Sequence, residues 1–243
     1  MKNDDLGTRM KEQYENRTRI KLPRRTNTII RLDGKAFHTF TKDFNRPFDV
    51  RFIYLMNETA EYLCENIQGC KFAYVQSDEI SLLLTDYDKI TSEAFFDGNI
   101  QKITSITASM ATMIFNEMLN EDDRITEKSQ RAMFDSRAFT IADKEEVINY
   151  FIWRQKDAVR NSVQMVAQSL YSHKELQGKN CSQLQDMIFN KGQNWNDYPI
   201  GQKRGRCVVK DSSGYWTISD PPTFTQDRDF IGNLMNVTIE DNI

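Results

Sequence analysis

The sequence predicts an α+β protein with a ferredoxin-like βαββαβ core, an antiparallel sheet with two helices, followed by a mainly helical C-terminal annex. Two observations carry this prediction. Short β-branched runs alternate with long segments whose apolar residues recur every three or four positions, and the elements follow one another as β-α-β-β-α-β. We expect residues 1–142 to form the core with a basic N-terminal segment, and residues 143–243 to form the annex, packed with the core as one unit.

The first strand is expected at Thr28–Leu32, where Asp33-Gly34 ends a β-branched run. A helix follows from about Asp49 to Ile67, because its apolar residues step by three and four as one buried helix face requires. Two apolar runs, Lys71–Val75 and Ile80–Leu84, flank the sequence Gln-Ser-Asp-Glu and predict a hairpin with an acidic tip.

A second helix from about Ser92 to Leu119, a loop at Asn120–Asp123 and a strand near Ala132–Ile141 complete the predicted core. Polymerase palms and nucleotide cyclases share this architecture, which by itself does not give a function. The core is therefore expected to hold a sheet of the polymerase-palm type.

The second half is predicted to be helical, with a small hairpin formed by Arg206–Lys210 and Tyr215–Ile218. Two capping boxes mark helix starts, each a polar residue followed three positions later by Glu or Gln. They are Asp143 with Glu146, ahead of Val147–Arg154, and Ser182 with Gln185, ahead of Met187–Asn190, which Gly192 closes.

Composition excludes several classes of protein. The chain contains 15 Phe, 9 Tyr and 3 Trp among 243 residues, enough aromatic surface to exclude a disordered chain. The longest uncharged stretch, Ile103–Asn116, is shorter than the ~20 residues of a membrane span, and the charged N-terminus is not a signal peptide. Four cysteines without a CxxC pair favour reduced thiols in the cytoplasm.

Charge is distributed unevenly along the chain. Residues 1–35 carry ten Lys or Arg against five Asp or Glu, and residues 143–210 carry eleven against seven, whereas the net charge of the whole chain is −3. Two interpretations stay open. The basic segments form surfaces for a polyanion, or they are merely solvated helix faces of different sign.

Two acidic positions are the main candidates for chemistry. Asp33 ends the first strand, and Asp78, with Glu79 beside it, lies at the hairpin tip. In a ferredoxin-like sheet these strands are neighbours about 4.8 Å apart, so the carboxylates repel one another unless a divalent cation lies between them. Mg²⁺ suits two carboxylates, and Gly34 lets the backbone approach so that its carbonyl adds a ligand. Each acid taken singly also fits a solvated turn.

Other polar residues lie close in sequence to these acids. Ser77, Lys35, His38 and Arg46 offer the hydroxyl and positive charges that a triphosphate requires. His38 alone equally fits a half-buried side chain. With only two histidines a His-based metal site is hard to build, and the chain has no GxSxG, Walker A or GxGxxG motif.

The residues at this point resemble a known family. The segments Arg31–Phe40 and Gln76–Glu79 are similar to the paired signature of tRNA-His guanylyltransferases. Further similar segments occur in the family's order, so that the resemblance runs from roughly Leu6 to Val209. They are Phe134–Arg137, Trp153–Asp157, Asn194–Asn196 and Lys203–Gly205.

The resemblance implies a function for individual residues. It implies that Asp33, the Gly34 carbonyl and Asp78 bind two Mg²⁺ ions. It also implies that Glu79 is a catalytic acid that supports this site. It implies GTP and ATP as substrates, tRNA as partner, and a homotetramer built as a dimer of dimers. The expected nucleotide-contacting residues, with the last two shared between triphosphate and RNA, are Asp33, Gly34, Lys35, Ala36, Phe37, His38, Arg46, Ser77, Asp78, Asn161, Lys203 and Arg204.

The sequence departs from the eukaryotic members of the family in one segment. Those members carry His-Ile-Asn-Asn-Leu-Tyr-Asn where this chain has Ala158–Gln164, and only Asn161 is clearly retained. In this respect the chain resembles the bacterial and archaeal guanylyltransferase-like branch, which prefers templated repair of tRNA lacking 5′ nucleotides.

The expected function is thus a template-dependent nucleotidyltransferase that adds nucleotides to the 5′ end of truncated tRNA, in the 3′-to-5′ direction, by two-metal phosphoryl transfer. Three alternatives stay open: a strict tRNA-His guanylyltransferase, a palm-fold nucleotide cyclase, and a non-catalytic tRNA-binding module.

Overall fold

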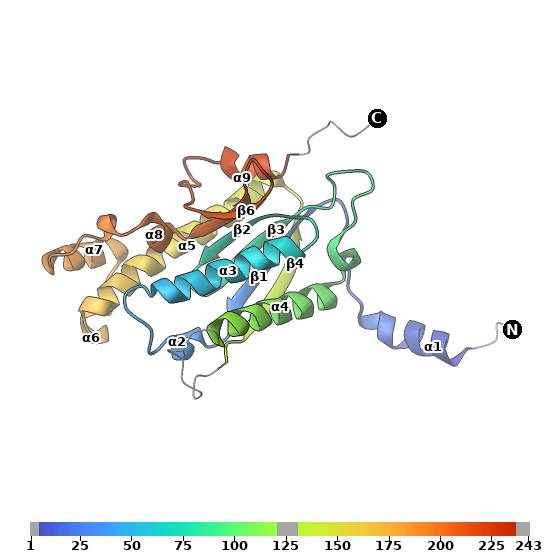
Figure 1. The fold of residues 1–243 in the computed structure, drawn as a ribbon, viewed down its shortest axis with the longest axis horizontal. Coiled ribbons are helices and arrows are strands. Elements are labelled where there is room, and N and C mark those ends of the chain that lie inside the picture. The colour runs from blue at the N-terminus through green and yellow to red at the C-terminus, as the bar shows by residue number, and fades with distance from the viewer. Residues whose placement is uncertain (1–4, 121–130, 237–243) are drawn as a thin grey trace.

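Six antiparallel strands form one sheet in the order β4-β1-β3-β2-β5-β6. The computed structural model describes residues 5–120 and 131–236 (Figure 1). The strands are β1 (Asn27–Gly34), β2 (Cys70–Gln76), β3 (Glu79–Leu84), β4 (Phe134–Ile141), β5 (Arg206–Lys210) and β6 (Trp216–Ser219).

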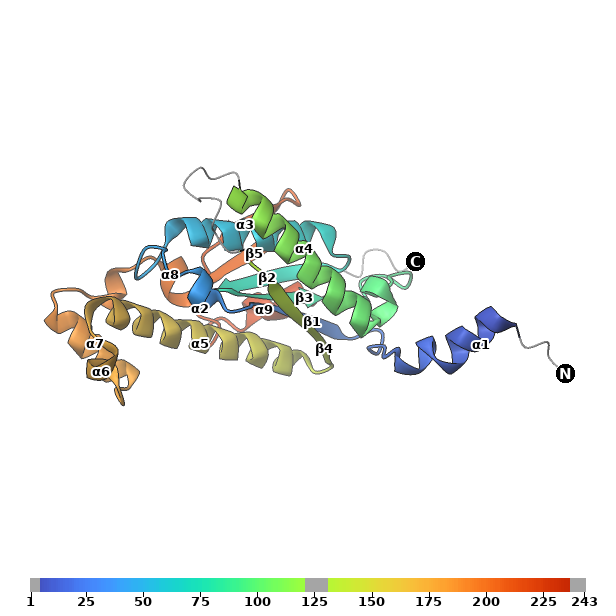
Figure 2. The ribbon, with the colours of Figure 1, turned by 90° about the horizontal axis from the view of Figure 1, so that it is seen from below.

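Helices cover both faces of this sheet. Helices α3 (Val50–Asn66) and α4 (Ile100–Asn120) lie on one face, and the long α5 (Lys144–Leu170) lies on the other (Figure 2). The order β1-α3-β2-β3-α4-β4 confirms the predicted succession of core elements. The β5–β6 hairpin, which we assigned to the annex, pairs with β2 and extends the core sheet.

The shorter helices lie around this frame. Helix α1 projects away from the sheet and buries no residue, whereas α7 packs on the end of α5 (Figures 1 and 2). No described helix is both long and apolar enough to cross a membrane. The short helices and 3₁₀ helices (η) are α1 (Leu6–Gln13), η1 (Glu15–Thr18), α2 (Phe37–Phe40), η2 (Phe95–Gly98), α6 (His173–Leu176), α7 (Cys181–Asn190), η3 (Trp195–Asp197), α8 (Ile200–Arg204) and α9 (Asp229–Leu234).

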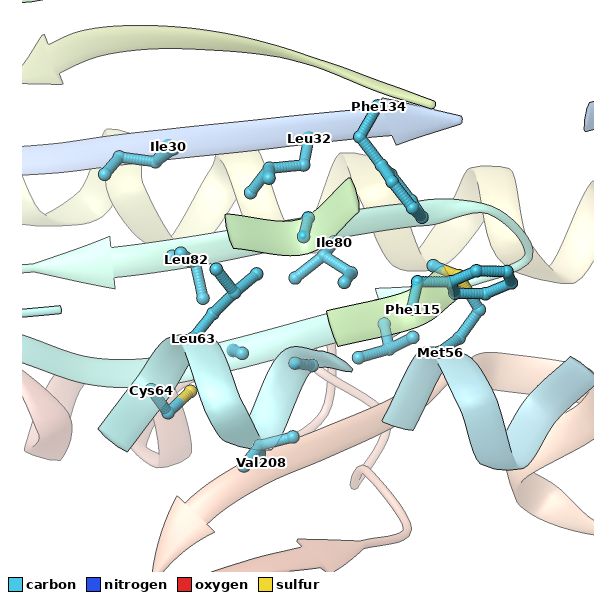
Figure 3. Close-up of a cluster of buried hydrophobic side chains, with 14 of the residues drawn as sticks. Ile30, Leu32, Met56, Leu63, Cys64, Ile80, Leu82, Phe115, Phe134 and Val208 are labelled. Atoms are coloured by element: carbon cyan, nitrogen blue, oxygen red, sulfur yellow. The ribbon is translucent and has the colours of Figure 1, made fainter. Parts of the chain in front are cut away.

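Strand alternation distributes the core over the two faces. Ile30 and Leu32 of β1 meet side chains of α3 and α4, including Phe115 (Figure 3). Ile29 points to the opposite face and joins the cluster under α5. Because period-2 alternation continues along the strand, Arg31 and Asp33 also belong to the α5 face. The end of β1 is thus held rigidly from both sides, and it presents Asp33 toward α5.

Both ends of helix α4 differ from the sequence expectation. Helix α4 begins at Ile100 rather than near Ser92, because Phe96 and Asp97 have positive φ values of 48° and 51°, which no α-helix allows. Asn120 is the last residue of α4 rather than a loop residue, and residues 121–123 lie outside the described part of the chain.

The capping boxes also differ in detail. The box ahead of α7 is formed by Asn180 and Gln183, not by Ser182 and Gln185, so the helix begins two residues earlier than its predicted cap implied. At the start of α5, Asp143 accepts a hydrogen bond from the Glu146 amide at 3.0 Å, as predicted. The Glu146 carboxylate accepts from Asn149 instead, so the second half of that box is missing. Helix α5 then runs far beyond the predicted Val147–Arg154.

Candidate active site

Asp33 and Asp78 lie together at one end of the sheet. Asp33 faces Glu79 in the antiparallel register of β1 and β3, and the Gly34 amide donates a hydrogen bond of 3.0 Å to the Asp78 carbonyl. Burial raises the pKa of Asp78 from its ordinary value to about 6, and the nearby charge of Asp33 acts in the same direction. Two carboxylates are therefore held close enough to repel one another, as the sequence analysis expected.

The chain around these acids is shaped by unusual backbone geometry. Ser77 sits in the two-residue turn between β2 and β3 with φ of 46°, and Ala36 has φ of 55° in the loop after β1. A Cβ atom at Gly34 would lie 2.3 Å from the Phe37 ring, so only glycine fits there. The Lys35 amide fixes the loop further by donating to the Met133 carbonyl at 2.8 Å.

The buried side chain of Phe37 holds this loop against the hydrophobic core. Its ring is 3% exposed and contacts the rings of Phe40, Phe52, Phe115 and Phe134 with centroid distances between 5.0 and 5.9 Å. Because the side chain is occupied in the core, only the Phe37 backbone is free to meet a ligand. The ring therefore fixes the loop rather than lining the cleft.

The Glu79 carboxylate forms a buried ion pair with an arginine. Arg154 of α5 donates from Nε to Glu79 Oε1 at 2.7 Å and from Nη2 to Oε2 at 2.9 Å, and both side chains are buried. Gln76 donates to the same carboxylate at 3.3 Å, and Arg31 lies 3.5 Å from it. The charge of Glu79 is thus neutralised by protein, and this acid ties α5 to the strand ends.

The Arg154 partnership was not predicted. Residues 79 and 154 are 75 positions apart, and no local pattern joins them. The only signal was that Trp153–Asp157 resembles a segment of the guanylyltransferases. Arg154 also donates to Asp157 at 2.8 Å, so the acid–base network continues along α5.

A cleft of about 520 Å³ opens between these acids and α5. Its lining carries charges of both signs on both sides. The sheet side has Arg31, Asp33 and Asp78, and α5 has Arg154, Arg160 and Asp157, which pairs with both of these arginines. Such an arrangement suits a ligand with phosphates, which needs cation-binding carboxylates and direct positive charge together. Ser77 and Asn161, both predicted site residues, line the same cleft.

The remaining predicted residues do not line this cleft. Lys35, Ala36 and Arg46 are exposed on loops, and His38 is exposed on the short helix α2. The Lys203 ammonium donates a hydrogen bond to the Asn196 carbonyl and lies 5.4 Å from the centre of the Trp195 ring.

Arg204 is fixed through its backbone, because its carbonyl accepts from the Tyr74 hydroxyl. These two basic residues at the end of α8 therefore reach a ligand only if it extends beyond the cleft.

The donor set at Asp33, Gly34 and Asp78 fits Mg²⁺. The described residues contain no cluster of three or more His, Cys, Asp and Glu side chains that would hold a metal by protein alone. Two carboxylates and a carbonyl leave the remaining positions of an octahedral ion to phosphate oxygens and water, which is the usual arrangement for Mg²⁺. The raised pKa of Asp78 points the same way, since a cation between the carboxylates would remove their repulsion.

Comparisons with known proteins agree with this geometry. The family described as tRNAHis guanylyltransferase matches residues 7–142. The chain belongs to this family. It is therefore a member of the guanylyltransferase family of nucleotidyltransferases, as the resemblance implied.

Solved structures extend the likeness over the whole chain. A bacterial tRNA(His) guanylyltransferase-like protein in complex with ATP has a TM-score of 0.90 at 44% identity, covering 96% of this chain and 100% of that one. A bacterial guanylyltransferase-like protein in complex with GTP has a TM-score of 0.80 at 42% identity, with 95% and 99% covered. The tRNA(His) guanylyltransferase of Schizosaccharomyces pombe is 28% identical over 215 residues, 82% of this chain and 78% of the relative.

The raised pKa of Asp78 yields a stability prediction. An acid whose pKa is higher in the folded than in the unfolded state destabilises the fold where it is ionised, so the cost is full above about pH 6 and vanishes below about pH 4. Without divalent cations, Asp78→Asn should raise the free energy of unfolding by about 1–3 kcal/mol at pH 8, less at pH 5 and not at all at pH 4. Urea unfolding in the presence of EDTA measures it.

Asp186→Asn, on the exposed surface of α7, is the matched control and should change stability by less than about 0.5 kcal/mol at each pH. Equal stability of Asp78→Asn and the unmodified protein at pH 8 would contradict the electrostatic account.

Proposed function

We propose that this protein is a template-dependent nucleotidyltransferase with a palm-type active site, which adds nucleotides in the 3′-to-5′ direction to the 5′ end of truncated tRNA. The observation that carries the proposal is the meeting of Asp33 and Asp78 at neighbouring strand ends, joined by the hydrogen bond from Gly34 to the Asp78 carbonyl. Relatives bound to ATP and to GTP support nucleoside triphosphates as substrates.

Different residues of the chain would bind the metal ions and the triphosphate. Asp33, the Gly34 carbonyl and Asp78 would hold two Mg²⁺ ions, which supply charge neutralisation of the phosphates and a lowered pKa for the attacking hydroxyl. The Ser77 hydroxyl would meet the triphosphate from the sheet side of the cleft. Lys35 and Arg46 on exposed loops, and His38 on the exposed side of α2, would add positive charge and donors outside the cleft.

We assign the α5 side of the cleft to binding the 5′ end of the RNA. The 5′ phosphate of the RNA would attack the α-phosphorus of a nucleoside triphosphate and release pyrophosphate. The 3′-hydroxyl of the incoming nucleotide would then attack the activated 5′ phosphate and release the nucleoside monophosphate. Arg160 is the exposed arginine of the cleft wall and has the reach to bind the 5′ phosphate. Lys203 and Arg204 contact more distant phosphates of the RNA or the triphosphate.

The residues that α5 presents to the cleft support template dependence. Within Ala158–Gln164, Ala158 and Val163 are buried against the rest of the protein, and Asn161 lines the cleft together with Arg160. Two polar side chains suffice to bind phosphate or sugar but do not form a dedicated base reader. Base pairing with the opposite strand of the acceptor stem would then select each added nucleotide.

Assembly and location complete the proposal. We expect a homotetramer, a dimer of dimers, in which exposed apolar side chains of the projecting N-terminal segment, such as Leu6, Met10 and Tyr14, find partners. The four cysteines are free, as expected for a protein of the cytoplasm.

Asp33→Ala and Asp78→Ala should each abolish nucleotide addition while leaving the fold intact. Loss of a carboxylate that positions the triphosphate removes several kcal/mol of transition-state stabilisation, so the rate should fall about a thousandfold or more. Extension of 5′-labelled, truncated tRNA with Mg²⁺ and nucleotides measures the rate, and circular dichroism reports the fold. Asp186→Ala serves as control, and near-normal turnover in either site variant would disprove the proposed chemistry.

Template dependence is tested by changing the base opposite the missing nucleotide. With C, G, A or U at that position, the nucleotide added should be G, C, U or A respectively, because pairing in the A-form stem makes the choice. Several tRNAs should serve as substrates. Guanosine added whatever the opposing base, and only to tRNA with a His anticodon, would indicate a strict guanylyltransferase.

The same assay separates the other two candidate functions. Conversion of the triphosphate to a cyclic nucleotide without RNA would indicate a cyclase. Binding of tRNA without extension would indicate a non-catalytic module.

A further inference from the structure

One aromatic side chain of the cleft has no part in the chemistry described so far. Trp153 of α5 lines the cleft and is 53% exposed. It is the only aromatic residue among the described residues that line this cleft. Tryptophan is highly buried on average, because its large ring is costly to leave in water. A half-exposed ring in this position therefore suits a ligand with a flat, apolar face.

The ring is held in a fixed position by the residues beneath it. The guanidinium carbon of Arg154 lies 4.3 Å from the ring centre, and that of Arg31 lies 6.0 Å from it. Both arginines also contact the buried Glu79 carboxylate, so they connect the ring to the protein interior. The Tyr150 ring packs edge-on at a centroid distance of 5.9 Å. A ring that is already ordered loses little conformational freedom when it binds a ligand.

Trp153 lies at the end of the cleft that is remote from a second, smaller cavity. This second cavity is an apolar pocket of about 50 Å³, and Gln76, Ser77 and Asn161 line both it and the cleft. Trp153 precedes Asn161 by two turns of α5, which is about 12 Å along the helix axis. The ring does not line the second cavity. Its partner must therefore be a group that occupies the other end of the cleft.

At that end the surface continues to the edge of the sheet. Arg31 faces Arg137 of β4 in the antiparallel register, so the two side chains lie on the same face of the sheet as α5. Arg137 is exposed and lies 3.1 Å from Asp135. Strand β4 is an edge strand, so no further strand covers this side. The exposed ring thus has an exposed arginine on either side, Arg137 on β4 and Arg160 on α5.

An exposed aromatic ring among arginines is suited to an unpaired base of RNA. Any base can stack on such a ring, because every base has an apolar face, while arginines bind the phosphates beside it. A base inside a stem is already stacked on its neighbours, so proteins bind unstacked bases in this way. In an RNA whose 5′ end is truncated, the unpaired bases are those of the opposite strand, at its 3′ end.

We propose that Trp153 stacks on an unpaired base of the 3′ strand at the acceptor end of the RNA, with Arg137 binding a phosphate of the same strand. The inference rests on the proposed function, which places the 5′ phosphate at Arg160. Trp153 and Arg160 lie on one face of α5, about 10 Å apart along its axis, so one RNA end can reach both. Stacking uses the face of a base and leaves its pairing edge free. Trp153 is therefore a positioning residue for the template strand.

The test compares RNA ends with and without unpaired bases. Fluorescence anisotropy measures the affinity of a labelled RNA hairpin with an unpaired 3′ overhang, and of a blunt hairpin with the same stem. Trp153→Ala should bind the overhang hairpin about 5- to 100-fold more weakly than the unmodified protein, the range for one lost base–aromatic stack. It should bind the blunt hairpin equally. Trp153→Phe keeps an aromatic ring and should recover most of the affinity.

Tyr54→Ala is the matched control, because Tyr54 is 55% exposed on α3, which covers the other face of the sheet. It should change no affinity. The slope of log affinity against log salt should be the same for Trp153→Ala and the unmodified protein, since no phosphate contact is lost. A smaller slope, or an equal loss for the blunt hairpin, would overturn the inference.

Two other roles of the ring give different results. If Trp153 only shields the pair of Glu79 and Arg154 from water, Trp153→Ala will lower stability and leave the affinity for the overhang hairpin unchanged. If the ring contacts the nucleoside triphosphate, the affinities for ATP and GTP will fall together with that for RNA. Either result would overturn the inference.

A measurement on the unmodified protein keeps the test valid if Trp153→Ala does not fold. An overhang whose unpaired nucleotides lack their bases keeps the phosphates but cannot stack, so it should bind at least about fivefold more weakly than the complete overhang. Equal affinity would overturn the inference. Failure of the unmodified protein to extend truncated tRNA would overturn the proposed function, whereas normal extension together with equal binding of the two overhangs removes only the role of Trp153.

Discussion

The buried pair between Glu79 and Arg154 is the interaction on which the site depends. It joins the hairpin between β2 and β3 to the middle of α5 through two hydrogen bonds of 2.7 and 2.9 Å. Desolvation offsets much of the attraction in such a pair, so its main effect is geometric. The same helix then carries Asn161 and Arg160 to the cleft, one turn and more beyond Arg154. The pair thus adds a polar link at the cleft to the apolar packing that already holds α5 on the sheet.

Arg154 neutralises one of the three acids that lie at this end of the sheet. Glu79 directly follows Asp78 in the chain and faces Asp33 across the sheet, so three carboxylates meet at this end. Three free negative charges would destabilise the fold strongly. Arginine neutralises Glu79, and the pKa of Asp78 is raised mainly by burial, with the charges of Asp33 and Glu79 acting in the same direction. Ionised Asp78 therefore carries an unfavourable energy that a cation bound at this site would release as binding energy.

Most of the sheet was predictable from local patterns, and so was the meeting of the two aspartates. The βαββαβ order follows from periodicity, and strand adjacency then brings Asp33 to the hairpin tip. The boundary errors have local causes: positive φ at Phe96 and Asp97 delays α4, and Asn180 rather than Ser182 caps α7. Phe37 stays a predicted nucleotide contact through its backbone, and the sequence did not reveal that its ring fills the space that Gly34 leaves open.

The contacts that could not be predicted are those between distant segments. Arg154 meets Glu79 across 75 positions, and Arg206 meets Asn57 across 149, and no periodicity or motif encodes either distance. The second case is the more informative, because Arg206 lies on a strand assigned to the annex and meets Asn57 only when β5 joins the core sheet beside β2.

Buried polar and charged groups are least well compensated where these distant segments meet. Natural sequences usually satisfy buried polar groups, and the exceptions concentrate where a ligand supplies the missing partner. Asp78 and Arg206, of opposite charge, lie on the two sides of Gln76 and Ser77, the two residues of the hairpin that line both cavities. The short hairpin tip between β2 and β3 therefore lies at the boundary between the two cavities and fixes their relative position.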